Sequence, residues 1–140
     1  MNAFTSSRQW PVAPSAVFAA IQDPARLARW WGPDGFSNEF KSFDFVPGGQ
    51  WVFNMIGPDG TVYPNECAFA HIETNRQVAI RHTCAPFFTL TLTMSPTPEG
   101  CLLHWEQAFD DAAVAQAIRH IVEPANEQNL DRLEVELGMG

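Results

Sequence analysis

The sequence contains very little positive charge. Its 140 residues include eight lysines and arginines against sixteen aspartates and glutamates, and the formal net charge is −8 at pH 7. Lys41 is the single lysine. A protein that binds nucleic acid or an anionic membrane surface needs a basic face. The composition therefore predicts neither a nucleic-acid partner nor a membrane partner.

Long apolar segments are also missing. A helix that spans a bilayer needs about 20 apolar residues. The longest uncharged stretch, His82 to Pro98, is interrupted by three prolines and by threonines at alternate positions. The N-terminal residues MNAFTSSRQWP lack the basic segment and following apolar run of a secretory signal. We therefore expect a cytoplasmic protein.

The sequence contains only three cysteines, and their spacing matches no paired motif. Cys67, Cys84 and Cys101 form no CxxC motif. An odd number of scattered cysteines is typical of reduced thiols in a cytosol, although a single disulfide is compatible with the sequence. The chain also lacks GxSxG, GxGxxG, Walker and EF-hand motifs. It therefore offers no motif for nucleophilic catalysis or for binding a nucleotide or calcium.

The four histidines are scattered rather than paired. None stands at HxH or HxxxH spacing from another. A zinc site needs three or four ligands that converge on one ion. The sequence therefore predicts no metal and no cofactor.

The remaining composition is that of a folded domain, with 46% hydrophobic and 12% aromatic residues. There is no internal repeat, linker or charge block, which predicts one domain over residues 1–140. Periodicity and turn residues predict a strand over 4–10, two short helices after Pro14 and Asp23-Pro24, and then strands near 36–45, 51–55, 61–72, 77–83, 88–94 and 102–109. A long helix follows from Asp110 or Asp111.

The long helix has an apolar stripe. Val114, Ala117, Ile118 and Ile121 are expected on one face, followed by Leu130, Leu133 and Leu137. Pro124 lies inside this span and should kink or restart the helix.

These elements predict an α+β fold in which a curved antiparallel sheet wraps around the C-terminal helix. The apolar face of the sheet and the apolar stripe of the helix must bury each other. We expect Ile118, Ile121, Leu130 and Leu133 to make that contact. A pocket should remain between sheet and helix, closed at one end by the two short helices.

Several short motifs occur in an order that resembles a known family. They are PSAVF from Pro14, Asp23-Pro24, WWGP from Trp30, DFVPGGQW from Asp44, GPDG from Gly57 and LDRL from Leu130. Together they resemble the homologues of the activator of heat-shock-protein ATPase, a family of the SRPBCC or START-like superfamily. The resemblance covers about residues 5–137 and implies the helix-grip fold, also known from birch-pollen allergens.

The resemblance implies a range of functions. Relatives include co-chaperone domains, lipid carriers, polyketide cyclases and uncharacterised bacterial proteins. The sequence departs from the family pattern at three places. Asn126 stands where relatives usually carry tryptophan, Pro124-Ala125 where a glycine is common, and Val46 where an arginine is frequent. A smaller side chain at position 126 and the proline should leave space beneath the helix.

The candidate site residues face the expected pocket. Trp30 lies beside a glycine-rich loop, and the others alternate onto the inward side of strands: Trp51, Phe53, His82, Phe88, Leu90 and Trp105. His82 is either a hydrogen-bonded structural residue or a polar anchor and base. Asp44 is expected to cap the Pro-Gly-Gly turn with its side chain. The direction of Glu66 is left open, because its strand has apolar residues on both faces.

The leading hypothesis is a protein that binds a small apolar molecule in this pocket. One alternative is an enzyme of the cyclase or dehydratase kind, in which His82 or a carboxylate moves a proton. The other is a co-chaperone-like module that binds protein and no small ligand. No residue is assigned a catalytic role, the balance is against an enzyme, and a homodimer is left open.

Overall fold

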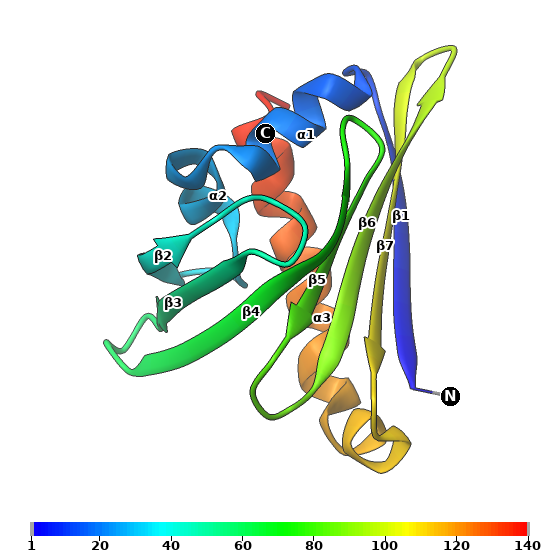
Figure 1. Cartoon of the computed structure of the whole chain (residues 1–140). Helices are drawn as coiled ribbons and strands as arrows, with labels where there is room; N and C mark the ends of the chain where they lie inside the picture. The colour runs from blue at the N-terminus through cyan, green and yellow to red at the C-terminus, as the bar shows by residue number, and fades with distance from the viewer. Residues whose placement is uncertain (1, 140) are drawn as a thin grey trace.

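The computed structural model describes residues 2–139 as a seven-stranded sheet and three helices (Figure 1). The strands are β1 (Ala3–Trp10), β2 (Ser37–Phe43), β3 (Gln50–Ile56), β4 (Val62–Glu73), β5 (Gln77–His82), β6 (Phe88–Thr97) and β7 (Gly100–Phe109). The helices are α1 (Pro14–Gln22), α2 (Pro24–Trp30) and α3 (Ala112–Glu136).

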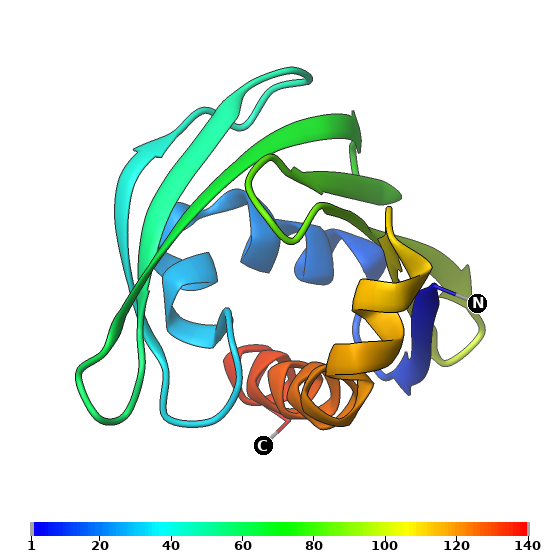
Figure 2. The same cartoon turned by 90° about the horizontal axis from the view of Figure 1, so that it is seen from below.

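The sheet is antiparallel throughout, in the order β1-β7-β6-β5-β4-β3-β2. All strands after α2 pair with their neighbours in sequence, and β1 pairs with β7. Figure 2 shows the sheet curving around α3, with α1 and α2 across one end. The predicted helix-grip fold is confirmed.

Local chemistry explains where the helices begin. Pro14 and Pro24 each occupy a first-turn position, where the missing N–H is not needed. The carboxylate of Asp23 accepts from the Ala25 amide at 3.0 Å, and that of Asp111 accepts from the Ala113 amide at 2.8 Å. These caps satisfy amide groups that have no partner within their helices.

The buried face of α3 differs from the predicted stripe. Leu130 and Leu133 are fully buried, as expected, but Ile121 is 60% exposed. Ala115 is buried there instead, and it packs in a cluster that includes Ile118. The first half of α3 has apolar residues on several sides, so periodicity alone favoured a face rotated away from the one that meets the sheet.

α3 runs through Pro124 as one element, so of the predicted kink or restart the restart does not occur. The prediction for the side chain of Asp44 was wrong. Asp44 turns the chain with its backbone rather than its side chain, because its carbonyl accepts from the Val46 amide at 2.9 Å. A Cβ at Gly49 would lie 2.0 Å from the same carbonyl oxygen, so this turn requires glycine at that position.

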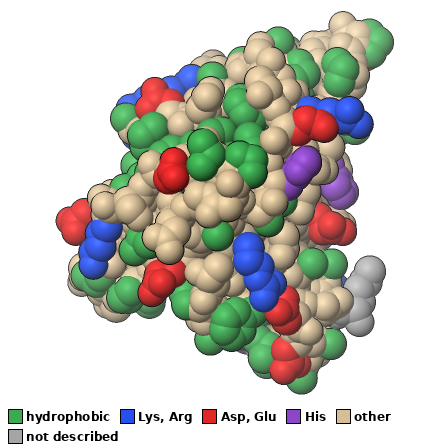
Figure 3. All heavy atoms as spheres, viewed as in Figure 1, with side chains coloured by type: hydrophobic (Ala, Val, Ile, Leu, Met, Phe, Trp, Pro, Cys, Tyr) green, Lys and Arg blue, Asp and Glu red, His purple; other side chains and the backbone are tan. Residues whose placement is uncertain are grey.

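The distribution of charged side chains on the surface (Figure 3) agrees with the small number of basic residues in the sequence. On the face shown in Figure 3, basic and acidic side chains are scattered among each other and form no broad basic area. No helix within residues 2–139 is long and apolar enough to cross a bilayer.

Candidate functional site

A cavity of about 260 Å³ lies between the sheet and α3. Five neighbouring strands contribute side chains to its wall. They are Phe53 and Met55 of β3, Asn65 and Cys67 of β4, Ile80 and His82 of β5, Phe88 and Leu90 of β6, and Trp105 and Gln107 of β7. Two residues per strand at alternate positions is the pattern expected where one face of a sheet lines a cavity.

The helix side of the cavity is partly polar. Ala125, Asn126 and Asn129 of α3 line it. The Asn126 side-chain amide donates to Gln107 Oε1 at 3.0 Å and so links α3 to β7. The cavity lies beneath this part of the helix.

The loop after α2 closes another side of the cavity through Trp31, Gly32 and Pro33. Asn129 holds this loop from α3, because its Nδ2 donates to the Trp30 carbonyl at 2.8 Å and its Oδ1 accepts from the Gly32 amide at 3.2 Å. Gly32 has a φ of +97°, a conformation that favours glycine.

Arg132 fixes the same loop. Its guanidinium donates to five backbone carbonyls at 2.8–3.1 Å: those of Arg29, Trp31, Gly32, Pro33 and Phe36. Burial lowers the pKa of Arg132 from its ordinary value. The arginine of the LDRL motif therefore shapes the cavity wall from outside and is not on its lining.

Two indole N–H groups are buried without a hydrogen-bond partner. They belong to Trp105 and Trp51. Trp105 lines the cavity, whereas Trp51 lies behind it, stacked on Phe53 at 4.2 Å between ring centroids. A buried donor without a partner is unfavourable and is rare in folded proteins.

His82 is held in one orientation on the wall. Its Nδ1 lies 2.7 Å from the Pro86 carbonyl oxygen and its Nε2 lies 2.8 Å from Asn65 Oδ1. The ring stacks on Phe88 with centroids 4.5 Å apart. Burial lowers the pKa of His82, although hydrogen bonds to the backbone at Pro86 and Cys84 oppose this. The imidazole is therefore favoured in its neutral form.

Cys67 is the other titratable group on the wall. It pairs with His82 across β4 and β5, and burial raises the pKa of its thiol to about 12. Among the described residues that line the cavity, none is aspartate, glutamate, lysine or arginine. The cavity is thus electrically neutral, with a few fixed polar groups.

Five of the seven candidate site residues lie together on this wall: Phe53, His82, Phe88, Leu90 and Trp105. Trp30 and Trp51 do not. Trp30 donates from Nε1 to the Ala20 carbonyl at 2.9 Å and belongs to the packing of α2 on α1. Its neighbour Trp31 faces the cavity instead, because the chain leaves the helix at that residue.

The polar wall residues were missed from the sequence, although a signal for some of them exists. Gln107 shares the parity of Leu103 and Trp105, and Asn65 shares that of Cys67. These five residues all lie on the inward side of their strands. A polar residue that alternates with inward apolar residues, as Gln107 and Asn65 do, therefore indicated a position that faces the cavity. The direction of the Glu66 side chain, which the sequence left open, is outward, because Glu66 is exposed.

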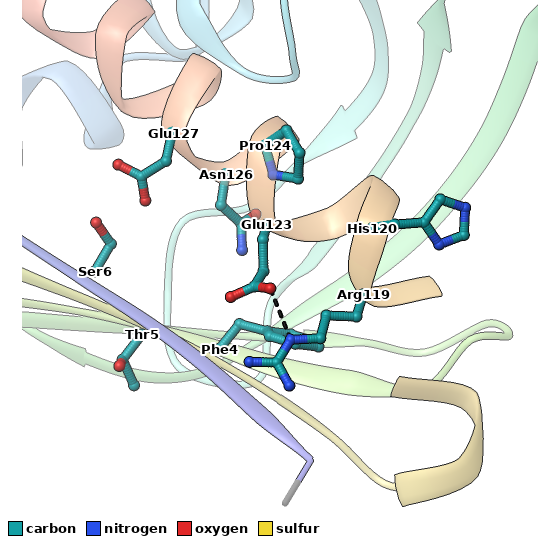
Figure 4. Close-up of a pocket in the computed structure, with 9 residues that line it drawn as sticks. All are labelled: Phe4, Thr5, Ser6, Arg119, His120, Glu123, Pro124, Asn126 and Glu127. Carbon is teal, nitrogen blue, oxygen red and sulfur yellow. Dashed lines mark hydrogen bonds and ion pairs between the residues drawn. The ribbon is translucent and has the colours of Figure 1, made fainter. Parts of the chain in front are cut away.

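A second hollow, about 470 Å³, is a groove between β1 and α3 (Figure 4). Phe4, Thr5 and Ser6 form one side of it. On the other side Arg119 and Glu123 point toward β1 and pair with each other at 2.7 Å, while His120 points away. The charges of the groove are already paired, and most of the residues that line it are exposed. The cavity between the sheet and α3, whose lining is mostly buried and uncharged, is therefore the better candidate site.

No metal site is evident. Within residues 2–139, no three histidine, cysteine, aspartate or glutamate side chains cluster so as to hold an ion. The three cysteines, all within that range, are free.

The fold and cavity define an SRPBCC-type helix-grip domain. The family model for the activator of Hsp90 ATPase homolog 1-like proteins matches residues 11–138, and the chain belongs to that family. No curated protein matches this chain by sequence.

Solved structures agree on the fold. A protein of Nitrosomonas europaea is 18% identical, with a TM-score of 0.89 over 98% of this chain and 94% of its own. The AHSA1 protein of Silicibacter pomeroyi is 24% identical, with a TM-score of 0.80 over 98% of each chain. An AHSA1-like protein of Aeromonas hydrophila is 16% identical, with a TM-score of 0.77 over 99% and 95%.

Proposed function

We propose that the protein binds a small, mostly apolar and uncharged molecule in the cavity between the sheet and α3. The observation that carries this proposal is a partly enclosed cavity lined by uncharged, mostly apolar side chains, among them Trp105, whose indole N–H has no partner among the described residues. A ligand acceptor that reaches this N–H, which neighbouring atoms cover, would give it a partner. Burial of its apolar surface would supply most of the affinity.

The size and charge of the cavity narrow the ligand class. Its volume of about 260 Å³ is below the roughly 300–1,000 Å³ of sites for drug-sized ligands. Burying a charged group without a partner is strongly unfavourable, and the wall offers no side chain of opposite charge. The ligand is therefore expected to be compact, with one or two polar atoms.

The two alternatives receive less support. Cyclase-like proton transfer inside the cavity needs both an acid and a base that face it. Besides His82, the described residues of the lining offer only Cys67, whose thiol stays protonated because burial raises its pKa. A module that binds only protein needs no internal space, and folded interiors contain few voids.

The first test fills the cavity. Acetophenone is a suitable probe because it is small and apolar and carries one carbonyl oxygen. We expect it to bind the protein in saturation-transfer NMR and to raise the melting temperature. Ala125→Phe on the cavity wall should abolish both effects, and Ala117→Phe on the exposed side of α3 should abolish neither.

The second test removes the donor. Trp105→Phe should weaken acetophenone binding roughly fivefold, which corresponds to about 1 kcal/mol for one hydrogen bond. The control is Trp51→Phe, which removes an equally buried N–H that is not on the wall. Unchanged binding in a folded Ala125→Phe variant contradicts the proposal. So does the absence both of acetophenone binding and of any co-purified small molecule in native mass spectrometry.

A further inference from the structure

A second chemical feature lies at the edge of the cavity, where β5 ends and the chain turns into β6. Cys84 Sγ lies 3.4 Å from Nε2 of His82, within the distance for a hydrogen bond to sulfur. The thiol is partly exposed, while the imidazole is on the cavity wall. A nucleophile and a base are therefore in contact next to the cavity.

The imidazole is oriented so that Nε2 can take a proton from the thiol. Both ring nitrogens face an oxygen that only accepts hydrogen bonds: Nδ1 lies 2.7 Å from the Pro86 carbonyl oxygen and Nε2 lies 2.8 Å from Asn65 Oδ1. In the tautomer that carries its hydrogen on Nδ1, Nε2 is the basic nitrogen, and it is the nitrogen that faces Cys84.

Asn65 prepares the site for the protonated ring. Its Nδ2 donates to the Tyr63 carbonyl at 2.9 Å, which directs Oδ1 toward His82 Nε2 at 2.8 Å. A neutral ring satisfies only one of its two facing acceptors, whereas a ring that has gained a proton donates to both. These two acceptors therefore partly offset the burial that disfavours the imidazolium, and they are in place before the reaction.

The other two cysteines do not share these properties. Cys67 and Cys101 are buried, and burial raises the pKa of each thiol. A buried thiol in apolar surroundings is inert, because the thiolate is the nucleophile. Cys84 is thus the cysteine of this chain that combines access with a base.

We propose that Cys84, with His82 as its general base, is a nucleophilic site that adds to small α,β-unsaturated carbonyl compounds. The choice of this class rests on the proposed function, since the unpaired N–H of Trp105 on the same cavity wall suits a carbonyl oxygen. The reactivity of the thiol itself needs only the pair of side chains.

The addition is balanced without a further reactant. His82 Nε2 takes the thiol proton, and Sγ forms a bond to the β-carbon. The electron pair of the carbon–carbon double bond moves to the α-carbon and its carbonyl as an enolate. The imidazolium returns the proton to the α-carbon, so the product is a thioether and the histidine is neutral again.

The first experiment measures the rate at which iodoacetamide alkylates Cys84, by intact mass and peptide mapping, between pH 5.5 and 9. At pH 6 the native protein should react roughly tenfold faster than a cysteine peptide, because the adjacent imidazole takes the thiol proton as the sulfur attacks. His82→Gln should remove this advantage. The control His104→Gln, at an exposed histidine bonded to Ser7, should keep it.

The second experiment uses 2-cyclohexen-1-one. We expect one addition per chain at Cys84, absent in Cys84→Ser and slowed in Ala125→Phe, which fills the cavity but leaves the thiol in place. Fast iodoacetamide alkylation without faster addition of the ketone would mean that the nucleophile is correct and the substrate class is wrong. Acetophenone binding to Cys84→Ser is measured in parallel, so that loss of the proposed ligand site is recognised separately.

The proposal is overturned if alkylation of the native protein follows the ordinary pH profile of a free cysteine. This comparison needs no variant, so it holds even if His82→Gln fails to fold. Equal rates for the native protein and a folded His82→Gln variant overturn it as well.

Discussion

Arg132 is the residue on which the shape of the cavity depends most without touching its interior. It donates to five carbonyls that span the end of α2 and the start of β2. A guanidinium has five N–H donors in a rigid plane, and here those donors fix the loop that carries Trp31. The loop residues Trp31, Gly32 and Pro33 form one side of the cavity.

Replacing Arg132 by methionine should lower the free energy of unfolding by roughly 2–3 kcal/mol, because several carbonyls lose a charged donor. Arg132→Lys should recover only part of this, since an ammonium group has three donors and a different geometry. Chemical denaturation measures both values. A loss below about 0.5 kcal/mol in Arg132→Met would show that water replaces the guanidinium without penalty.

At the scale of the element, α3 has two different halves. After Pro124 it buries Asn129, Leu130 and Leu133 against the loop and the sheet. Before Pro124 it buries only Ala115, and Ile121 faces outward. The second half of α3 therefore contributes most of the helix's buried side chains to the core. The first half contacts β1 and β7 through Ala115.

Truncation of side chains on the two halves should give very different results. Leu130→Ala should destabilise the protein by about 3 kcal/mol, as expected for a fully buried leucine. Ile121→Ala should change the stability by less than about 0.5 kcal/mol, because the side chain is exposed. Thermal and urea unfolding of the two variants provide the measurement, and equal losses would contradict the assigned face.

At the scale of the whole molecule, ion pairs connect the C-terminal part of α3 to elements far away in sequence. Glu136 binds Arg26 and Arg29 of α2, each at 2.9 Å. Arg8 of β1 binds Glu127, Asp131 and Glu134 at 2.7–3.0 Å. These contacts tie β1 and α2 to the C-terminal part of α3.

Glu136 should make the free energy of unfolding decrease as the pH falls into the acid range. Hydrogen bonds from Arg29 and Arg26 lower its pKa to about 2 from an ordinary 4.5. The folded state therefore binds fewer protons than the unfolded state, so the contribution is complete above pH 4.5 and is lost as the pH falls toward 2.

The size of this contribution is about 1 kcal/mol, since Arg29 is largely exposed and water screens the pair. Glu136→Gln should remove the corresponding loss of stability between pH 4.5 and 2. Glu123→Gln, at an exposed pair within α3, should leave it in place. The check is urea unfolding at several pH values, and identical acid profiles for both variants would refute the assignment.

The sequence was most informative about elements with strong local signals. Alternation of Phe88, Leu90 and Leu92 with threonines predicted a strand, and Asp23-Pro24 predicted a helix start. These signals suffice because the backbone and its nearest side chains decide them. Five wall residues of the cavity followed from the same alternation, since it also says which side chains share a face.

Periodicity and turn residues gave wrong predictions where contacts with distant segments determine which of two similar side chains is buried. Trp30 and Trp31 are adjacent indoles, and only the exit of the chain from α2, held by Asn129 and Arg132, turns one of them into the cavity. Ile121 had an apolar pattern as good as that of Ile118, but the position of α3 on the sheet buries a different side. The pairing of Cys84 with His82 likewise arises from the loop between β5 and β6, which no periodicity describes.

The amino-acid sequence by itself determined the class of fold, because the order of strands and helices and their apolar faces allow few ways of burial. It also determined that the surface is acidic and that the interior is rich in aromatic residues. The tertiary structure alone decided that Asn126 and Asn129 of α3 line the cavity and which indole N–H groups remain unpaired. Those outcomes depend on contacts between residues that are far apart in sequence, and local pattern contains no information about them.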